Sequence, residues 1–109
     1  MKKEHYILGK NHELIETDLM TWATFFEVNS NRRVALDKIG DVSLSTVFLG
    51  INHNFGDGEP LLFETMIFGG ERNDEQWRWH TWEEAEQGHK KILEELNRAD
   101  TPPPKSAEQ

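Results

Sequence analysis

The sequence contains no cysteine, and this absence narrows the chemistry that the protein can carry out. Without cysteine there is no disulfide framework, no thiolate nucleophile, and no zinc or iron–sulfur site built on cysteine ligands. The lack of cysteine also fits a reducing cytoplasm. Long apolar runs are missing as well, since no segment approaches the roughly 20 residues that a membrane-spanning helix needs. We therefore expect a cytoplasmic protein without membrane contact.

Clustered basic residues are scarce too. The net charge is −8, and residues 41–109 carry all of it, with six basic and fourteen acidic side chains. Binding to a phosphate backbone depends on grouped Lys and Arg side chains that displace counterions. We therefore expect no direct contact with nucleic acid. An acidic surface that fills the basic groove of a partner protein is an alternative that the charge leaves open.

The sequence does contain enough large apolar side chains for one core. Six Phe and four Trp occur among the 109 residues, whereas two separate cores in so short a chain would bury too little apolar surface. We predict a single domain over residues 1–98. Residues 99–109, which include three consecutive prolines, are predicted to form a disordered, acidic, proline-rich tail.

The first third of the chain predicts a hairpin and a short helix. Two short apolar segments flank a turn at residues 9–12 that contains Gly and Asn, which is typical of a β-hairpin. Thr17 and Asp18 then offer a helix N-cap, and apolar residues follow at helical spacing. The helix is expected to end near Val28.

The middle of the chain is rich in β-branched and aromatic residues, which predicts four strands. Turn residues separate these segments, and the first two strands are expected to form an antiparallel hairpin. The predicted strands span residues 32–39, 42–52, 61–68 and 76–80.

A C-terminal amphipathic helix is predicted from the capping box of Thr81 and Glu84 to about Asn97. Its apolar stripe comprises Trp82, Ala85, His89, Ile92, Leu93 and Leu96. The predicted fold is therefore α+β: a mostly antiparallel sheet of about five to six strands, with the short helix and the C-terminal helix packed on one face.

The longest loop gathers polar residues that could form a binding site, namely His53, Asn54, Asp57 and Glu59. Their spacing does not match a Ca²⁺-binding loop, because the position that requires glycine holds Asp57. A transition-metal site would find two plausible ligands here where three or four are needed. The alternative is a polar loop whose glycines provide the turn geometry. We predict no bound metal, no cofactor and no catalytic residue.

Glu64 is a charged residue in an otherwise apolar strand. A carboxylate that is buried there needs an ion-pair partner, because an unpaired buried charge is too costly. The candidates on neighbouring strands are Arg33, Arg78 and His80. A structural ion pair or an exposed strand face is favoured over a catalytic acid.

His89 lies on the apolar stripe of the last helix, directly after Gly88. Glycine within a helix costs roughly 1 kcal/mol relative to alanine, so a close approach of backbone or ligand would explain its presence. His89 is therefore a candidate binding residue. The alternative, which we favour, is a core histidine whose ring donates to a backbone carbonyl.

The strand before this helix alternates aromatic and polar residues, with Trp77 and Trp79 on one face and Arg78 and His80 on the other. Exposed aromatic side chains beside arginine are typical of interface hot spots. Packing of both tryptophans under a helix is the alternative. No nucleophile–base pair stands out in the sequence, so an enzyme is the less favoured class.

Two long motifs resemble a known family. Residues 45–70 read STVFLGINHNFGDGEPLLFETMIFGG, and residues 81–89 read TWEEAEQGH. Together with DLMTW at residues 18–22, they are similar to a family of small uncharacterised proteins from bacteriophages and prophages. The resemblance covers most of the chain except the tail. It implies a phage-derived protein in the cytoplasm of a bacterial host, and it assigns no activity and no functional residue.

Three hypotheses for the function remain. The leading one is a phage-derived protein-interaction module that binds and modulates a host or phage protein through the loop at 53–59, the strand at 77–80 and the acidic helix. The second is a small metal-dependent enzyme or ligand-binding protein with a site around residues 52–64 and His89. The third is an accessory or structural phage protein that self-associates through an exposed sheet surface. The oligomeric state does not follow from the sequence.

Overall fold

The structure of the chain, a computed structural model, describes residues 4–28, 32–54, 56 and 58–100. Its six strands and two helices confirm the predicted α+β class and the predicted order of elements. The strands divide into two antiparallel sheets rather than one. The small sheet pairs β1 (Tyr6–Leu8) with β2 (Leu14–Glu16), and the large sheet has the order β3 (Arg33–Ile39), β4 (Val42–Phe48), β5 (Phe63–Phe68), β6 (Gln76–Trp79).

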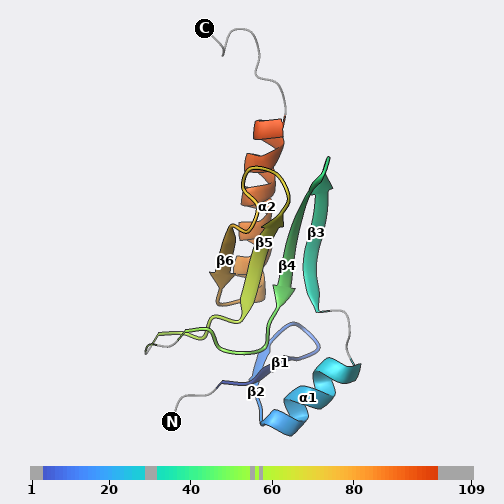
Figure 1. Cartoon of the computed structure of the whole chain (residues 1–109). Helices are drawn as coiled ribbons and strands as arrows, with labels where there is room; N and C mark the ends of the chain where they lie inside the picture. The colour runs from blue at the N-terminus through green and yellow to red at the C-terminus, as the bar shows by residue number, and fades with distance from the viewer. Residues whose placement is uncertain (1–3, 29–31, 55, 57, 101–109) are drawn as a thin grey trace, which may run out of the picture.

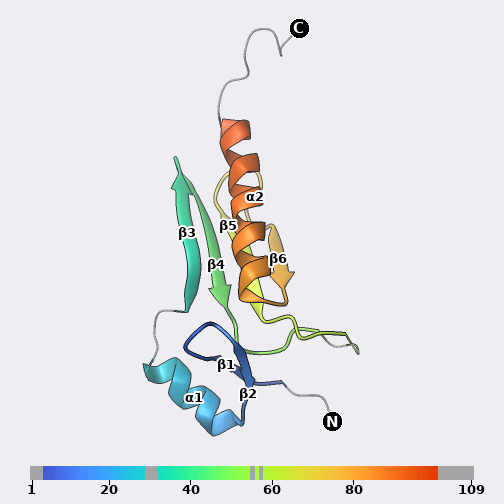
Figure 2. The same cartoon turned by 180° about the vertical axis from the view of Figure 1, so that it is seen from behind.

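The long helix α2 (Trp82–Asp100) covers one face of the large sheet and contacts all four of its strands. It lies behind the sheet in Figure 1 and in front of it in Figure 2. The predicted apolar stripe faces the sheet, and its buried members are Ala85, His89, Ile92 and Leu96. Neither helix in the described part of the chain is apolar over a sufficient length to cross a membrane.

The predicted capping box begins α2. The backbone N–H of Glu84 donates to Thr81 Oγ1 at 3.1 Å, which gives a partner to an N–H that the helix itself cannot satisfy. The Glu84 carboxylate reaches one residue further back than the motif predicts and accepts from the His80 N–H at 2.9 Å. The helix ends at Asp100, two residues beyond the predicted domain boundary. The predicted tail from residue 101 onward lies outside the described residues.

Strand β4 ends at Phe48, four residues earlier than predicted, because the chain turns at Gly50. Gly50 has a φ of +71°, a left-handed conformation that favours glycine. A Cβ at this position would lie 2.6 Å from the ring of Phe26. Glycine therefore lets the first helix pack closely against the end of the large sheet. Beyond the turn, Ile51 forms an isolated bridge with His5.

Helix α1 (Leu19–Val28) and the β1–β2 hairpin form an N-terminal module at one end of the large sheet (Figure 1). Asp18 caps α1 as predicted, since its Oδ1 accepts the N–H of Thr21 at 2.7 Å. This hydrogen bond lowers the pKa of the Asp18 carboxyl group, because it stabilises the charged form.

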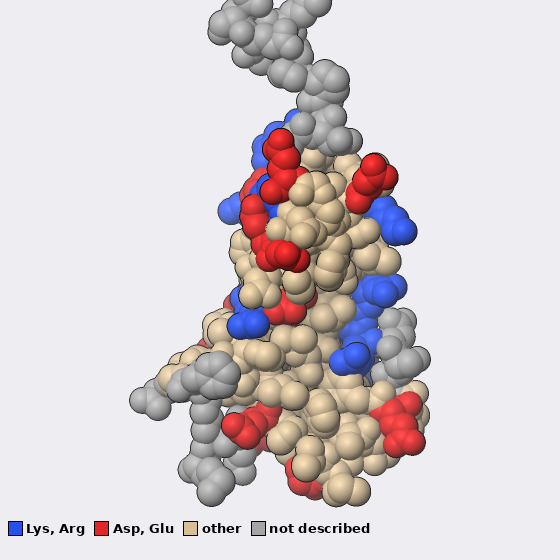
Figure 3. Space-filling view, viewed as in Figure 1, with Lys and Arg blue, Asp and Glu red and all other residues tan. Residues whose placement is uncertain are grey.

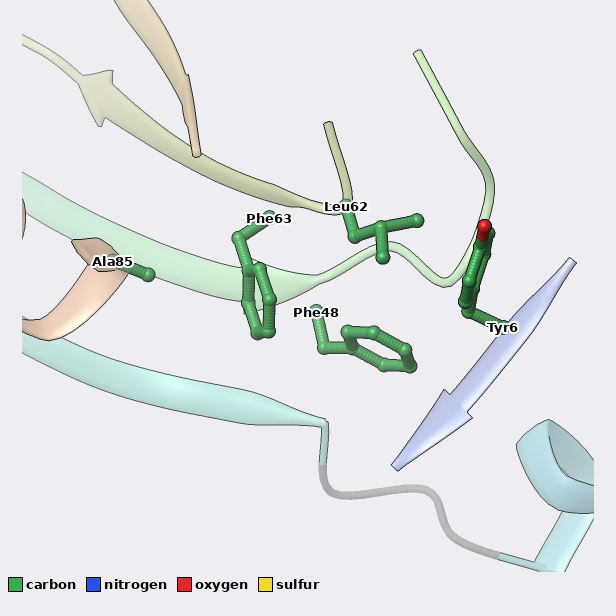
Figure 4. Packing of buried hydrophobic residues seen from close by; sticks show 5 residues of the cluster. All are labelled: Tyr6, Phe48, Leu62, Phe63 and Ala85. Carbon is green, nitrogen blue, oxygen red and sulfur yellow. The ribbon is translucent and has the colours of Figure 1, made fainter. Parts of the chain in front are cut away.

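One hydrophobic core joins the module to the large sheet. The rings of Phe26 and Phe48 are stacked with centroids 5.9 Å apart. In Figure 4, Phe48 lies between Tyr6 of the module and Phe63 of the sheet, and all three are buried. The two sheets are therefore parts of a single packed unit and not independent domains.

Candidate functional site

The large sheet presents two different faces, because alternate residues of a strand point to opposite sides. The covered face packs against α2. No described element packs on the other side, which we call the open face. The covered face carries Asp37, Ile39, Leu44, Thr46, Phe48, Phe63, Thr65, Ile67, Trp77 and Trp79. The open face carries Arg33, Leu36, Lys38, Ser43, Ser45, Val47, Glu64, Met66, Phe68, Gln76 and Arg78.

Five side chains between the sheet and α2 are joined by hydrogen bonds, and we call them the polar chain. Trp79 Nε1 lies 2.9 Å from Thr65 Oγ1, which lies 2.5 Å from Thr46 Oγ1. Thr46 Oγ1 lies 2.7 Å from His89 Nδ1. His89 Nε2 lies 2.8 Å from Asp37 Oδ2. The polar chain thus crosses the whole sheet from β6 to β3 and includes α2.

The Asp37 end of the polar chain fixes the direction of its hydrogen bonds when the His89 imidazole is neutral. The Asp37 carboxylate can only accept, so it accepts from the Nε2–H of His89, and Nδ1 then accepts from Thr46. The Thr46 hydroxyl in turn accepts from Thr65, and Thr65 accepts from the indole N–H of Trp79. In this assignment every one of these buried hydrogens has an acceptor, as burial of polar groups requires.

Three members of the polar chain have the order of a catalytic triad, in which a carboxylate orients a histidine that activates a hydroxyl group. They are Asp37, His89 and Thr46. Thr46 is 0% exposed, so a substrate cannot reach its hydroxyl unless α2 is displaced. His89 is a core histidine, as the favoured alternative predicted, but its ring partners are side chains rather than a backbone carbonyl. The polar chain therefore fastens α2 to the sheet.

Gly88 allows Trp79 to reach the polar chain. A Cβ at residue 88 would lie 2.3 Å from ring atoms of Trp79, so any side chain there would displace the indole. A group does approach this glycine closely, but it is the side chain of Trp79 and not the backbone or ligand that was predicted. Trp77 also packs under α2, with the guanidinium carbon of Arg72 5.7 Å from its ring centroid. Trp77 and Trp79 therefore both pack under the helix, as the second of the two predictions for this strand stated.

Glu64 lies on the open face, directly opposite Arg78 on β6. Glu64 Oε2 is 3.2 Å from Arg78 Nε, and the Glu64 side chain is only 16% exposed. A carboxylate so shielded from water needs a charged partner. The predicted structural ion pair is therefore present, and Arg78 is the partner.

His53 lies near this ion pair, at the beginning of the long loop. Burial lowers the pKa of His53 and the cation of Arg78 lowers it further, while the Glu64 carboxylate acts in the opposite direction. The neutral imidazole is therefore favoured. Near the end of the same loop, the carbonyl oxygen of Pro60 lies 2.9 Å from Nδ1 of His80, the residue that follows β6.

The loop itself is shaped by amide side chains. Asn52 Oδ1 accepts the backbone N–H of Asn54 at 2.8 Å. The Asn54 side chain accepts from the Gly56 N–H and donates to the backbone carbonyl of Glu59, both at 2.9 Å. These bonds are typical of a polar loop that holds its own turns. Asp57, which was predicted as a binding residue, lies outside the described residues, and the Glu59 side chain is exposed.

The predicted site residues do not converge on one cleft. Glu64 projects from the open face, whereas His89 is buried beneath α2 on the covered face. One site therefore cannot include both Glu64 and His89. Within the part of the chain that the structure describes, no three His, Asp or Glu side chains are grouped closely enough to hold a metal ion.

Sequence reasoning missed three members of the polar chain: Asp37, Thr46 and Thr65. The threonines did leave a signal, since each takes an apolar position in a strand, as Thr46 does between Leu44 and Phe48. That signal is weak because β-branched threonine is common in strands. Nothing in the sequence indicated a role for Asp37 in this hydrogen-bonded chain, because acidic residues are common on edge strands.

Neither protein-family models, nor curated proteins, nor solved structures match this chain. The two faces of the large sheet and the surface of the N-terminal module are the features from which a function can be inferred.

Proposed function

We propose that the protein is a non-enzymatic interaction module that binds another protein, of host or phage origin, through the open face of its large sheet. The observation that supports this is that no described element covers the open face, although it carries apolar side chains. Leu36 and Phe68 are 41% and 47% exposed there. An antiparallel sheet with one side in water normally places polar residues on that side, and exposed apolar patches mark interaction sites.

The open face combines apolar and polar side chains, as protein interfaces do. Val47, Met66 and Phe68 lie on its two central strands beside Ser43, Ser45 and Glu64, and Leu36 lies on the edge strand β3 among charged residues. Figure 3 shows uncharged atoms over much of this face, with Asp or Glu atoms among them near the middle and Lys and Arg atoms along the β3 side.

The charge of the open face indicates the kind of partner. Among the residues of the four strands that point to this face, Arg33, Lys38 and Arg78 are basic and Glu64 is acidic, although the whole chain carries a net −8. A partner with an apolar patch edged by acidic side chains would complement this face, and such complementarity favours rapid and specific association. The outer side of α2 lies on the opposite side of the molecule, so one flat contact cannot include both (Figures 1 and 2).

An enzymatic alternative has less support. Thr46 and His89, the hydroxyl and the imidazole of the triad-like arrangement, are buried beneath α2, and Glu64 and His89 lie on opposite faces of the sheet. The resemblance to phage proteins, which is an expectation from sequence motifs, suggests the bacterial cytoplasm as the first place to look for the partner.

Site-specific photo-crosslinking tests the proposal. Benzoylphenylalanine in place of Ser45 would lie in the middle of the open face, and the same group in place of Gln87 would lie on the exposed side of α2. Irradiation in bacterial cells should give one discrete heterologous product from position 45 and none from position 87. Equal crosslinking from both positions, or no product from position 45, would contradict the proposal.

A pair of charge variants sharpens the same test. Leu36→Glu removes an exposed apolar side chain and adds an acid to a basic face, so it should abolish the crosslink from position 45. Gln87→Glu adds the same charge on the exposed side of α2 and should leave the crosslink unchanged. Both variants should melt close to the unmodified chain, because both positions are exposed.

A further inference from the structure

Helix α1 is apolar around most of its circumference, yet none of its ten residues is buried. A helix of this composition normally lies inside a protein or inside a complex. Its inner side, with Trp22 and Phe26, packs toward the turn at Gly50. Its outer side exposes Met20 and Val28 by 75% and 74%, the largest values for any large apolar side chain of the described residues.

We infer that the outer side of α1 binds a second copy of the same chain, with the two helices antiparallel about a two-fold axis at Thr24. Met20, Thr24 and Val28 are four residues apart and form one ridge, with large side chains at its ends and a small one at its centre. In an antiparallel pair, Met20 of each copy meets Val28 of the other. Two-fold interfaces are self-complementary in this manner.

A shallow, open hollow lies along this ridge and supports the same arrangement. It is lined by Met20, Thr21, Thr24, Phe25 and Val28, all from α1. Because Thr24 at its centre is small, two copies that cross at this residue can approach closely, with Met20 and Val28 on either side of the crossing.

Charge also favours an identical partner at this surface. Two copies that each carry −8 repel one another wherever acidic surfaces meet. Helix α1 carries a single charged residue, Glu27, so two copies can approach here with little direct repulsion. A membrane surface fits less well, because a helix that lies on lipid usually has several Lys and Arg residues on its polar side.

The size of the contact sets its strength. A helix of ten residues is about 15 Å long. A pair of such helices buries less than the roughly 1,200–2,000 Å² of a standard stable interface. The dimer is therefore weak and reversible. Added salt should strengthen it by screening the repulsion between the two acidic chains, whereas salt would weaken a contact between an acidic and a basic surface.

Complementary charges provide the first test, by sedimentation velocity of the full chain over a wide range of concentrations. The unmodified chain should dimerise as concentration rises, whereas Met20→Lys and Val28→Glu should each remain monomeric. An equimolar mixture of the two variants should dimerise again, because the introduced lysine at position 20 meets the introduced glutamate at position 28. Gln87→Lys and Gln87→Glu are the matched controls on α2 and should behave as the unmodified chain does.

The absence of cysteine allows a second test that does not depend on these charges. Thr24→Cys places one thiol at the proposed two-fold axis, and mild oxidation should convert much of the protein to a covalent dimer. Gln87→Cys should remain largely monomeric under the same conditions.

Three results would overturn the inference: an unmodified chain that stays monomeric at the highest concentration, a mixture that fails to restore dimerisation, or equal oxidation of both cysteine variants. A monomer would leave the outer side of α1 to a partner of different sequence. The crosslink from position 45 reports on the open face alone, so either conclusion can fail without the other.

Discussion

The covered and open faces belong to the same four strands, yet they are stabilised in different ways. On β4, Thr46 is buried within the polar chain, whereas its neighbour Ser45 points to the open face. On β5, Thr65 has two hydrogen-bonding partners beneath α2, whereas Glu64 forms an ion pair on the open face. The covered face thus buries polar groups whose hydrogen bonds are complete.

This difference shows that residue type alone does not locate the functional surface. The residues with the chemistry of a catalytic site are Asp37, His89 and Thr46, and the last two are buried beneath α2, whereas the Asp37 side chain is 44% exposed. The proposed binding surface consists of ordinary apolar and basic residues that no other element covers. The following predictions test the contrast between the two faces, from the largest expected effect to the smallest.

The largest difference is expected between two phenylalanines. Phe48 is fully buried on the covered side and Phe68 is 47% exposed on the open side. Phe48→Ala should lower the free energy of unfolding by about 3–5 kcal/mol, because it leaves a cavity in the core that joins the module to the sheet. Phe68→Ala should lower it by less than about 1 kcal/mol. Urea denaturation measures both, and similar losses would mean that the open face is packed against something.

The hydroxyl of Thr46 provides the next comparison. Thr46→Val keeps the shape of the side chain but leaves Thr65 without its acceptor and His89 Nδ1 without its donor. We expect a loss of about 1–3 kcal/mol in the free energy of unfolding. Ser45→Val, one residue away on the open face, should change it by less than about 0.5 kcal/mol. If Thr46→Val were as harmless as Ser45→Val, the polar chain would not fasten α2.

Gly88→Ala tests the contact between α2 and Trp79. The added methyl group would collide with the indole, at an expected net cost of about 1–2 kcal/mol, since overpacking outweighs the gain in helix propensity. Gln87→Ala, at the preceding exposed position, should leave the free energy of unfolding nearly unchanged. A Gly88→Ala chain that is more stable than the unmodified one would show that Trp79 can move aside freely.

The smallest effect concerns His53 and pH. Because its pKa in the folded chain lies below the ordinary value, the unfolded chain takes up the proton first as the pH falls. Stability is therefore complete above the ordinary histidine pKa of about 6.5 and decreases as the pH falls below it. His53→Gln should show a smaller decrease in melting temperature between about pH 7.5 and pH 5.5 than the unmodified chain. An identical decrease in both would contradict the assigned environment of His53.

Much of the fold could be predicted because its signals are local. The capping residues Asp18 and Thr81 and the apolar stripe of α2 predicted both helices, and alternation predicted the strands. The division into two sheets could not be predicted, because it depends on long-range pairing. The early end of β4 depends on the contact between Gly50 and Phe26, which lie far apart in the sequence.

The candidate site was predictable to a lesser degree. The ion pair between Glu64 and Arg78 followed from a charged residue in an apolar strand, which demands a partner. The polar chain could not be predicted, because its members come from four strands and one helix, and Asp37, Thr46 and Thr65 look ordinary by themselves. Nothing in the sequence showed which face of the sheet α2 would leave open.

The ¹⁵N NMR spectrum of the His89 imidazole at neutral pH tests most directly whether the polar chain closes the covered face. The assigned hydrogen bonds predict a proton on Nε2, an unprotonated Nδ1 that accepts from Thr46, and a slowly exchanging Thr46 hydroxyl proton. A ring that carries its proton on Nδ1, or that averages between the two tautomers, would contradict this description, because Thr46 would then lack its acceptor and Asp37 its donor.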